Sequence, residues 1–443
     1  MVDSLRDVPV FVHEKPGSYD GGYYAQIATD PSLRDRDFRT AIDDPGYRAR
    51  RILLAAMAWV TGGGEPRAVV HAYAALNLGL WLALALVLWR LLPPEGWRGN
   101  VAWVGVMYSA GALLSVRLAL TDLAALLLLA GATRLAEGTR PGPAAALIGG
   151  AALARETAVL GLVTLWRNAA EALRAPGRAA LWTALALVPL AGWMIYVRQA
   201  FGGSGAGLGN LTWPLSGWLS RWMELWQGID TIGNPRLAVE SGLEHLALTV
   251  QVVYLLGRPR QDCPWWRLGI AYVVLFAILG HAVWGGFPNA ASRVLLPLTL
   301  AFNVRAVRDR ARLGWLLLGN LSVFAGVHAL WLPPGTPHQL PAHSTWASRH
   351  VLETDDRWSA AEWHGRYRWA WCAETGGLSF RAWPHRERAR LELELRGLTP
   401  RTLEVRHAGT VVWRGQIGDR PGWISLPELP MTRGRLELEL HCP

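Results

Sequence analysis

The first candidate for chemistry is an acidic and aromatic segment near the N-terminus, SYDGGYYAQIATDPSL, at residues 18–33. Asp20 precedes a pair of glycines, so we expect the backbone to turn sharply there and to present the carboxylate. Such a carboxylate can take a proton from an attacking hydroxyl or hold a metal ion. The other polar side chains of the segment, which we treat as supporting residues, are Tyr19, Tyr23, Tyr24 and Asp30.

A basic cluster follows this segment at Arg48, Arg50 and Arg51. Arginine binds phosphate through paired hydrogen bonds of matching geometry. Carboxylates and arginines at a membrane surface therefore suit a reaction on an anionic, lipid-linked substrate. The alternative is structural, because Asp-Gly and Asp-Pro are turn sequences and arginines anchor helices at membrane interfaces. These residues alone leave both interpretations open.

A second candidate is a set of ionisable side chains inside apolar segments. Such groups are costly in a bilayer and usually mark function, although salt bridges that only hold helices together are the alternative. Arg155 and Glu156 are adjacent, so their side chains point in different directions and each needs another partner or a ligand. The set comprises Arg117, Asp122, Arg155, Glu156, His281 and Arg293.

The elements that must position these residues are apolar helices. The chain of 443 residues is 51% hydrophobic and only 18% charged, whereas a soluble chain is normally about a quarter charged. Apolar segments recur that are long enough, or nearly so, to cross a hydrocarbon core that needs about 20 residues. We expect spans at about residues 67–90, 100–116, 118–134, 179–200, 241–257, 268–284, 294–306 and 313–332.

The net charge of +10 does not indicate a nucleic-acid partner, because the arginines are spread over short loops between apolar segments. The 25 tryptophans also fit a membrane, where this residue collects at both interfaces. In the loop at 201–240, Trp218, Trp222 and Trp226 recur at every fourth position, which predicts one face of an interfacial helix. We therefore expect membrane lipids among the partners.

The run at residues 143–166 carries Arg155 and Glu156 in its middle, so it is either one span or a re-entrant pair of short helices. A re-entrant pair, with the N-terminal segment outside, gathers the later arginine-rich loops on the cytoplasmic side, whereas one span turns them outward. The positive-inside rule therefore favours the re-entrant pair. The arginines then predicted to lie inside include Arg90, Arg98, Arg134, Arg140, Arg174, Arg178, Arg258, Arg260, Arg267, Arg305, Arg308, Arg310 and Arg312.

The sequence thus predicts an α-helical polytopic membrane protein with a small C-terminal all-β sandwich. Residues 1–66 would form an extracytoplasmic first loop with interfacial helices, 67–333 a transmembrane domain, and 334–443 an extracytoplasmic linker and β domain. The β prediction follows from period-two alternation after about Leu378. Cys372 and Cys442 flank this domain, where an outside compartment would allow a disulfide; two unpaired thiols are the alternative.

Four short motifs resemble a family of bacterial multi-spanning proteins described as cell-surface glycopolymer formation proteins, which is similar to the GT-C glycosyltransferase superfamily. The motifs lie at residues 19–31, 50–53, 121–122 and 154–157, within a stretch of roughly 19–330. The chain departs from the pattern in two places. It begins about twenty residues before Asp20, where a transmembrane helix is expected, and Leu54-Ala55 stand where Tyr-Pro is expected.

The resemblance implies a bacterial cytoplasmic-membrane enzyme that uses a sugar on a polyprenyl phosphate. Asp20 would be the base or a metal ligand, and Arg155, then Arg51, Arg293 and Arg48 would hold the donor phosphate. No cofactor is expected with certainty, and the resemblance leaves a divalent metal open.

The predicted function is therefore sugar transfer to an envelope glycan, lipid or protein acceptor at the outer face of the membrane. A transporter or flippase of lipid-linked glycans and a non-catalytic scaffold of a glycopolymer assembly complex are the alternatives. A transporter should carry polar residues at corresponding positions of two repeats, and the sequence has no convincing repeat. A scaffold should tolerate the loss of Asp20.

Overall fold

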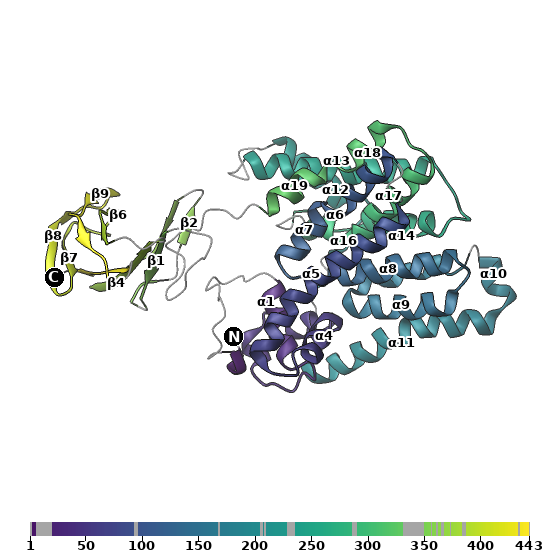
Figure 1. Cartoon of the computed structure of the whole chain (residues 1–443), viewed down its shortest axis with the longest axis horizontal. Helices are drawn as coiled ribbons and strands as arrows, with labels where there is room; N and C mark the ends of the chain where they lie inside the picture. Colours follow the sequence, from purple (N-terminus) through teal and green to yellow (C-terminus); the bar gives the residue numbers. More distant parts are fainter. Residues whose placement is uncertain are drawn as a thin grey trace. The chain divides into compact units, whose positions relative to one another are not determined.

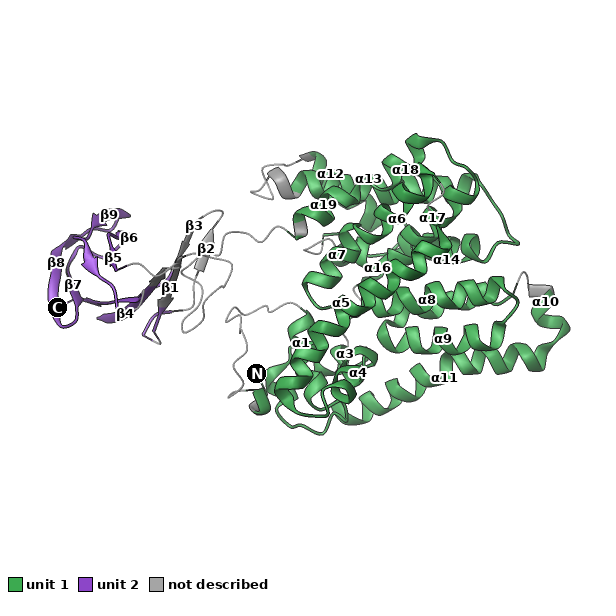
Figure 2. Ribbon diagram, viewed as in Figure 1, with its two compact units in different colours: residues 1–9, 19–331 green, residues 10–18, 332–443 purple. Residues whose placement is uncertain are grey.

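The computed structural model describes residues 2–5, 20–92, 96–166, 169–203, 207, 210–227, 235–285 and 290–330 of the N-terminal part, and in the C-terminal part residues 350–355, 357–359, 362–364, 367–372, 374–382, 387–432 and 435–442. The chain divides into two compact units (Figure 2). Unit 1 comprises residues 1–9 and 19–331, and unit 2 comprises residues 10–18 and 332–443. The first unit is helical and the second is built of strands.

Unit 1 begins with a group of short elements that pack onto the first long helix. Tyr24, Ile27, Phe38 and Leu54 share one buried cluster with Tyr73 of that helix. The N-terminal residues are therefore part of the helical unit. The short elements are η1 (Asp3–Leu5), α1 (Asp20–Thr29), α2 (Phe38–Ala41), α3 (Pro45–Arg48) and α4 (Leu53–Thr61).

The rest of unit 1 is a bundle of helices that run back and forth between two ends (Figure 1). Each predicted span coincides with one helix or with two consecutive helices, as far as residue 330. The elements are α5 (Pro66–Leu91), α6 (Trp97–Met107), α7 (Ala110–Arg117), α8 (Asp122–Glu137), α9 (Pro141–Ala154), η2 (Glu156–Thr164), α10 (Ala169–Arg174), α11 (Pro176–Phe201), α12 (Ser216–Gln227), α13 (Pro235–Gly257), α14 (Pro264–Ile278), α15 (His281–Trp284), α16 (Ala290–Val294), α17 (Leu296–Arg308), α18 (Leu313–Gly319) and α19 (Ser322–Ala329).

Two helices of the described residues, α5 and α11, are long and apolar enough to cross a membrane, or three spans if the bent pair α6–α7 counts as one. Each of the two has 26 residues, which gives about 39 Å at the rise of an α-helix. They expose large apolar side chains such as Leu86 and Val188. Contiguous apolar surface of this kind indicates association with a membrane. The larger number of spans expected from the sequence stays a prediction.

The run at 143–166 folds back on itself. The segment leaves one end of the bundle as α9 and returns as the 3₁₀ helix η2. A Cβ added to Gly161 of η2 would lie 3.3 Å from Ile148 of α9, and the two ends of the segment, Pro141 and Thr164, line one cavity. This geometry agrees with the re-entrant pair predicted from the sequence. Arg155 and Glu156 lie at its tip.

The predicted tryptophan helix is present as α12, but its three tryptophans do not share one environment. The Trp218 ring packs against His245 and Phe276, whereas Trp226 is almost fully exposed. The helix therefore anchors at its N-terminal end.

Unit 2 contains a five-stranded antiparallel sheet of order β1-β4-β11-β7-β8 and three two-stranded ribbons, β10-β5, β2-β3 and β6-β9. Leu436, Leu438 and Leu440 of β11 are buried while the residues between them are exposed, which is the period-two pattern expected. The strands are β1 (His350–Thr354), β2 (Glu362–His364), β3 (Tyr367–Trp369), β4 (Thr375–Ala382), β5 (Arg388–Ala389), β6 (Glu392–Leu395), β7 (Arg401–His407), β8 (Thr410–Ile417), β9 (Gly422–Ser425), β10 (Leu429–Pro430) and β11 (Arg435–His441).

The expected disulfide is not formed, because Cys372 and Cys442 are both free thiols. The register of β4 and β11 pairs His441 with Thr375, and the Cys442 amide donates to the Glu374 carbonyl at 2.7 Å. Cys442 therefore lies opposite Glu374, whereas Cys372 precedes β4 and forms an isolated bridge with Trp358.

The start of α1 fits closely against the backbone before α8, which yields a prediction. A Cβ at Gly21 would collide with the carbonyl oxygen of Leu118. We expect Gly21→Ala to destabilise unit 1 by about 1–3 kcal/mol, the usual cost of overpacking. The measurement is reversible unfolding in mixed micelles.

The matched control is Gly79→Ala in α5, where an added Cβ meets nothing within 4 Å. Alanine favours a helix by up to about 1 kcal/mol over glycine, so this variant should be at least as stable as the natural chain. Equal effects of the two substitutions would contradict the close fit at Gly21.

Candidate functional site

Charged side chains gather where the N-terminal helices meet one end of the bundle. This end is made by the start of α1, the end of α9 and the start of α8 (Figure 1). We call it the Asp20 end. Its charged side chains are Asp20, Asp43, Arg48, Arg51, Asp122, Arg155, Glu156 and Arg293.

Asp20 is the first residue of α1, and the sharp turn expected there is not found. The glycines that follow belong to the first helical turn, and Gly21 serves the close contact with Leu118. A carboxylate at this position is favoured by the positive end of the helix dipole. The side chain is 24% exposed, and its Oδ1 lies 2.8 Å from Nη1 of Arg48. Among the described residues, Oδ2 makes no hydrogen bond.

Arg48 joins two carboxylates. Its Nε and Nη2 donate to the two oxygens of Asp43 at 3.0 and 2.7 Å, while Nη1 faces Asp20. Its guanidinium also lies over the rings of Tyr23 and Tyr47, 5.3 Å from each centroid. Partial burial alone would raise the pKa of Asp43, but the hydrogen bonds from Arg48 outweigh it and hold that pKa below its ordinary value. Asp43 therefore stays charged and keeps Arg48 in place.

Arg51 lies deeper and uses all three of its nitrogens. Nε donates to Glu156 at 3.0 Å, which ties the first segment to the tip of the re-entrant pair. Nη1 donates to the Tyr24 hydroxyl at 2.7 Å, and Nη2 donates to the Tyr47 hydroxyl at 3.2 Å. The Tyr47 hydroxyl also accepts from Asn210, so the loop after α11 reaches this site.

Asp122 is the most buried carboxylate of the cluster, with a side chain 2% exposed. Arg155 forms an ion pair with its Oδ1, and Nη1 of Arg293 lies 3.6 Å from its Oδ2. The Ser115 hydroxyl donates to Oδ2 at 3.4 Å. Two cations therefore face one carboxylate. Nε of Arg155 is buried and has no hydrogen-bond partner among the described residues, which is the position of a donor that a water or ligand oxygen could fill.

The adjacent charged residues Arg155 and Glu156 have separate partners, as expected because their side chains point in different directions. Arg155 reaches Asp122 in α8, whereas Glu156 reaches Arg51 before α4. The sequence predicted the need for partners and did not identify them.

Other sequence candidates stand apart from this cluster. Asp30 accepts the backbone amides of Ser32, Arg34 and Asp35 at 2.8–3.1 Å, so its carboxylate holds the turn together. His281 is 59% exposed and pairs with Glu224, although a position inside a span was expected. Arg117 is an exposed residue at the end of α7. Tyr19 lies outside the described residues.

The sequence reasoning missed one polar residue and gave no role to another. Tyr47 precedes the basic cluster, and its ring lies near the arginines at positions 48, 50 and 51. Glu244 is buried in α13, where its Oε1 accepts the Ser292 amide at 2.8 Å. A charge inside an apolar run was the available signal for Glu244.

The residues around Asp20 do not favour a bound metal ion, because the described side chain paired with the Asp20 carboxylate is the cation Arg48. Among the described residues there is no group of three or more His, Cys, Asp or Glu side chains placed to hold a metal ion. Asp20 fits a base or an ion-pair partner better than a metal ligand.

Comparisons with known proteins add no relative: the chain matches no protein-family model, no curated protein and no solved structure. The functional argument therefore depends on the geometry of the Asp20 end.

The burial of Asp122 gives a testable expectation. Asp122→Asn removes the charge that compensates Arg155, and an uncompensated buried charge costs about 3–5 kcal/mol. We expect that loss of stability in mixed-micelle unfolding. The second variant Asp122→Asn/Arg155→Met should recover much of it, because it removes the stranded cation as well. A single variant as stable as the natural chain, or a double variant no better than the single one, would contradict the pairing.

Proposed function

We propose that the chain is a GT-C-like membrane glycosyltransferase. It would transfer a sugar from a polyprenyl-phosphate donor to an envelope glycan, lipid or protein acceptor. The observation that carries the proposal is the partly exposed carboxylate of Asp20 beside Arg48, in one cluster with Arg51 and Arg155. Glycosyl transfer needs a base beside the acceptor and positive charge beside the departing phosphate, and this cluster holds both.

Asp20 is the best candidate for the base among the carboxylates of the cluster. Asp122 is almost fully buried, and Glu156 accepts a hydrogen bond from Arg51. Asp43 has both oxygens bonded to Arg48. Glu156 is as exposed as Asp20, at 24%, but its ion pair with Arg51 ties the first segment to the tip of the re-entrant pair, so we assign the base to Asp20.

In the proposed step, Asp20 takes the proton of the acceptor hydroxyl while that oxygen attacks the anomeric carbon. The bond from the anomeric carbon to the phosphate oxygen breaks, and the phosphate leaves with the electron pair. Protonation of Asp20 removes its attraction for Nη1 of Arg48, so this one donor is released towards the leaving group while Nε and Nη2 stay on Asp43. Four arginines balance four carboxylates in the free cluster, so this release supplies the net positive charge that the phosphate requires.

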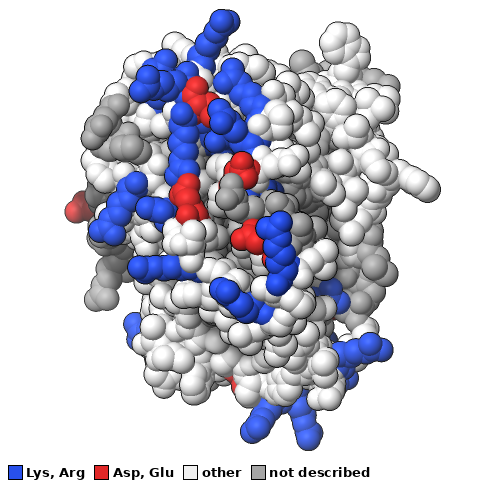
Figure 3. Space-filling model, turned by 90° about the vertical axis from the view of Figure 1, so that its right-hand side faces the viewer, with Lys and Arg blue, Asp and Glu red and all other residues white. Residues whose placement is uncertain are grey.

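The proposed setting is a bacterial cytoplasmic membrane crossed several times, with the Asp20 end and unit 2 outside. Its support is the distribution of arginine. The loops around Arg134, Arg178, Arg260 and Arg308 contribute to two hollows at the end of the bundle opposite Asp20. Figure 3 looks onto that end, where blue basic side chains outnumber the red acidic ones among them. Basic loops on one side are typical of a cytoplasmic face.

A non-catalytic scaffold is the second candidate, and the same ion pairs favour it. A network whose charges balance internally can hold helices together without binding a substrate. The two functions differ in what they require of Asp20, because a scaffold needs only the fold.

The proposal predicts that Asp20→Asn lowers sugar transfer by about two orders of magnitude or more, the scale of a lost general base. The substitution keeps the size of the side chain, so folding should be little changed. The measurement is release of polyprenyl phosphate from polyprenyl-phosphate sugars by the full chain in reconstituted membranes with envelope acceptors.

The matched control is Asp35→Asn, the same substitution in the same segment. Asp35 accepts the Asp37 amide through Oδ1, and the amide oxygen of asparagine can do the same, so transfer should stay unchanged. Full activity of a folded Asp20→Asn variant would remove Asp20 from the mechanism and favour the scaffold.

A further inference from the structure

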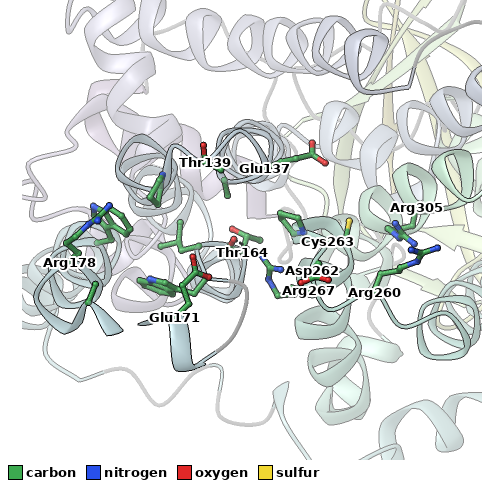
Figure 4. Close-up of a pocket in the computed structure, with 17 residues that line it drawn as sticks. Glu137, Thr139, Thr164, Glu171, Arg178, Arg260, Asp262, Cys263, Arg267 and Arg305 are labelled. Carbon is green, nitrogen blue, oxygen red and sulfur yellow. Dashed lines mark hydrogen bonds between the residues drawn. The ribbon is translucent and has the colours of Figure 1, made fainter. Parts of the chain in front are cut away.

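A cavity of about 660 Å³ lies at the end of the bundle opposite Asp20. It forms where α8 ends, where α9, α11 and α14 begin, and where α17 ends (Figure 4). Figure 4 places Arg178 on one side and Arg260 and Arg305 on the other, with Arg267 and Asp262 between them. None of these residues takes part in the proposed transfer.

Of the lining arginines, Arg267 donates all three of its nitrogens to backbone carbonyls, whereas Arg305 and Arg260 keep donors available. The Arg305 side chain is only 7% exposed, and it binds Asp309 through Nη2 alone. Among the described residues, its Nε and Nη1 make no hydrogen bond. Arg260 is exposed and forms no ion pair within the described part of the chain. Arg178 has a cation–π contact, 5.1 Å from the centroid of Trp182.

Three helices also direct their N-terminal ends towards the cavity. Their first residues are Pro141, Pro176 and Pro264, and none of the three has a side-chain cap. Uncapped N-termini leave amide donors and a partial positive charge. Such ends bind anions well, which strengthens the effect of the arginines.

The carboxylates of the lining do not cancel this positive character. The lining holds the four arginines shown in Figure 4 and three carboxylates, Glu137, Glu171 and Asp262. Glu137 forms ion pairs with Arg308 and Arg134, which lie outside the lining. The surroundings therefore carry more positive than negative charge.

The aromatic part of the lining indicates where the ligand comes from. Trp166 and Trp182 stack with centroids 6.5 Å apart, and both line the cavity beside Arg178. Tryptophan is favoured at the level of lipid head groups. Basic pockets between transmembrane helices bind multiply charged lipid head groups.

We propose that this cavity is a binding site for phosphate groups, and that they belong to the head group of an anionic phospholipid. The uncapped start of α11 with Arg178 would hold phosphate on one side, and Arg260, Arg305 and the start of α14 on the other. Two positive walls suit a head group with two phosphates. The site is independent of the transfer proposed for the Asp20 end.

The test measures lipid bound to the full chain by native mass spectrometry, after reconstitution in phosphatidylcholine vesicles with and without cardiolipin. A second arm measures pyrophosphate binding to the protein in neutral detergent. We expect retained cardiolipin, at least tenfold less of it in Arg178→Gln/Arg260→Gln, and no change in Arg34→Gln/Arg198→Gln. The control removes two exposed arginines near the Asp20 end.

A second variant, Ala175→Asp, keeps every arginine and adds a carboxylate at the N-cap of α11. Aspartate is a preferred N-cap, so the helix should hold while the new carboxylate occupies the place of a phosphate. Cardiolipin retention should again fall at least tenfold.

Tight pyrophosphate binding that both variants abolish would support the site and assign it to a soluble phosphate. Equal retention of cardiolipin by the natural chain and both variants would overturn the proposal. So would the absence of any binding of cardiolipin or pyrophosphate by the natural chain.

Discussion

The buried charge of Asp122 is the constraint on which the Asp20 end depends. A carboxylate removed from water within an apolar bundle is costly unless a cation compensates it. Asp122 begins α8, and its partners come from the tip of the re-entrant pair and from α16. With Arg155 drawn inward to Asp122, Glu156 is left to Arg51, and Arg51 fixes the two tyrosines beside it. This chain of ion pairs therefore adds to the buried apolar cluster that packs the first segment onto the bundle.

The two ends of the bundle differ in how they treat charge. At the Asp20 end, arginines and carboxylates pair within the protein. At the other end, arginines and uncapped helix starts surround a cavity. Helix α8, with 16 residues, separates the two ends by about 24 Å. A reaction at one end and lipid binding at the other can coexist without sharing a residue.

Much of the helical fold could be predicted from the sequence, because long apolar runs separated by short charged loops are typical of helices packed in a membrane. The run at 67–90 became α5 (Pro66–Leu91), and the fold-back of residues 143–166 agrees with the re-entrant pair that the positive-inside rule favoured over a single span. The period-two pattern likewise identified β11. These patterns involve residues that are close in the sequence, so they can be recognised from one sequence.

The rest depended on contacts between distant residues. Gly21, which follows Asp20, was interpreted as part of a turn. Its lack of a side chain instead allows close contact with the Leu118 backbone, 97 positions away in the sequence. The unpaired state of Cys372 and Cys442 likewise depends on how distant segments of unit 2 pair. The cavity joins the beginnings of three helices scattered along the sequence. Hydropathy and residue spacing do not predict such contacts between distant segments.

The central claim is that the Asp20 end faces outward and that the opposite end, with the arginine-lined cavity, faces the cytoplasm. Its most direct test is labelling of intact cells with a membrane-impermeant maleimide, using single cysteines in a cysteine-free chain. The account predicts that Arg34→Cys, near Asp20, is labelled from outside, whereas Arg174→Cys and Arg260→Cys are labelled only after the membrane is opened. All three positions are exposed on the protein. Labelling of position 174 or 260 in intact cells, with position 34 protected, would contradict it.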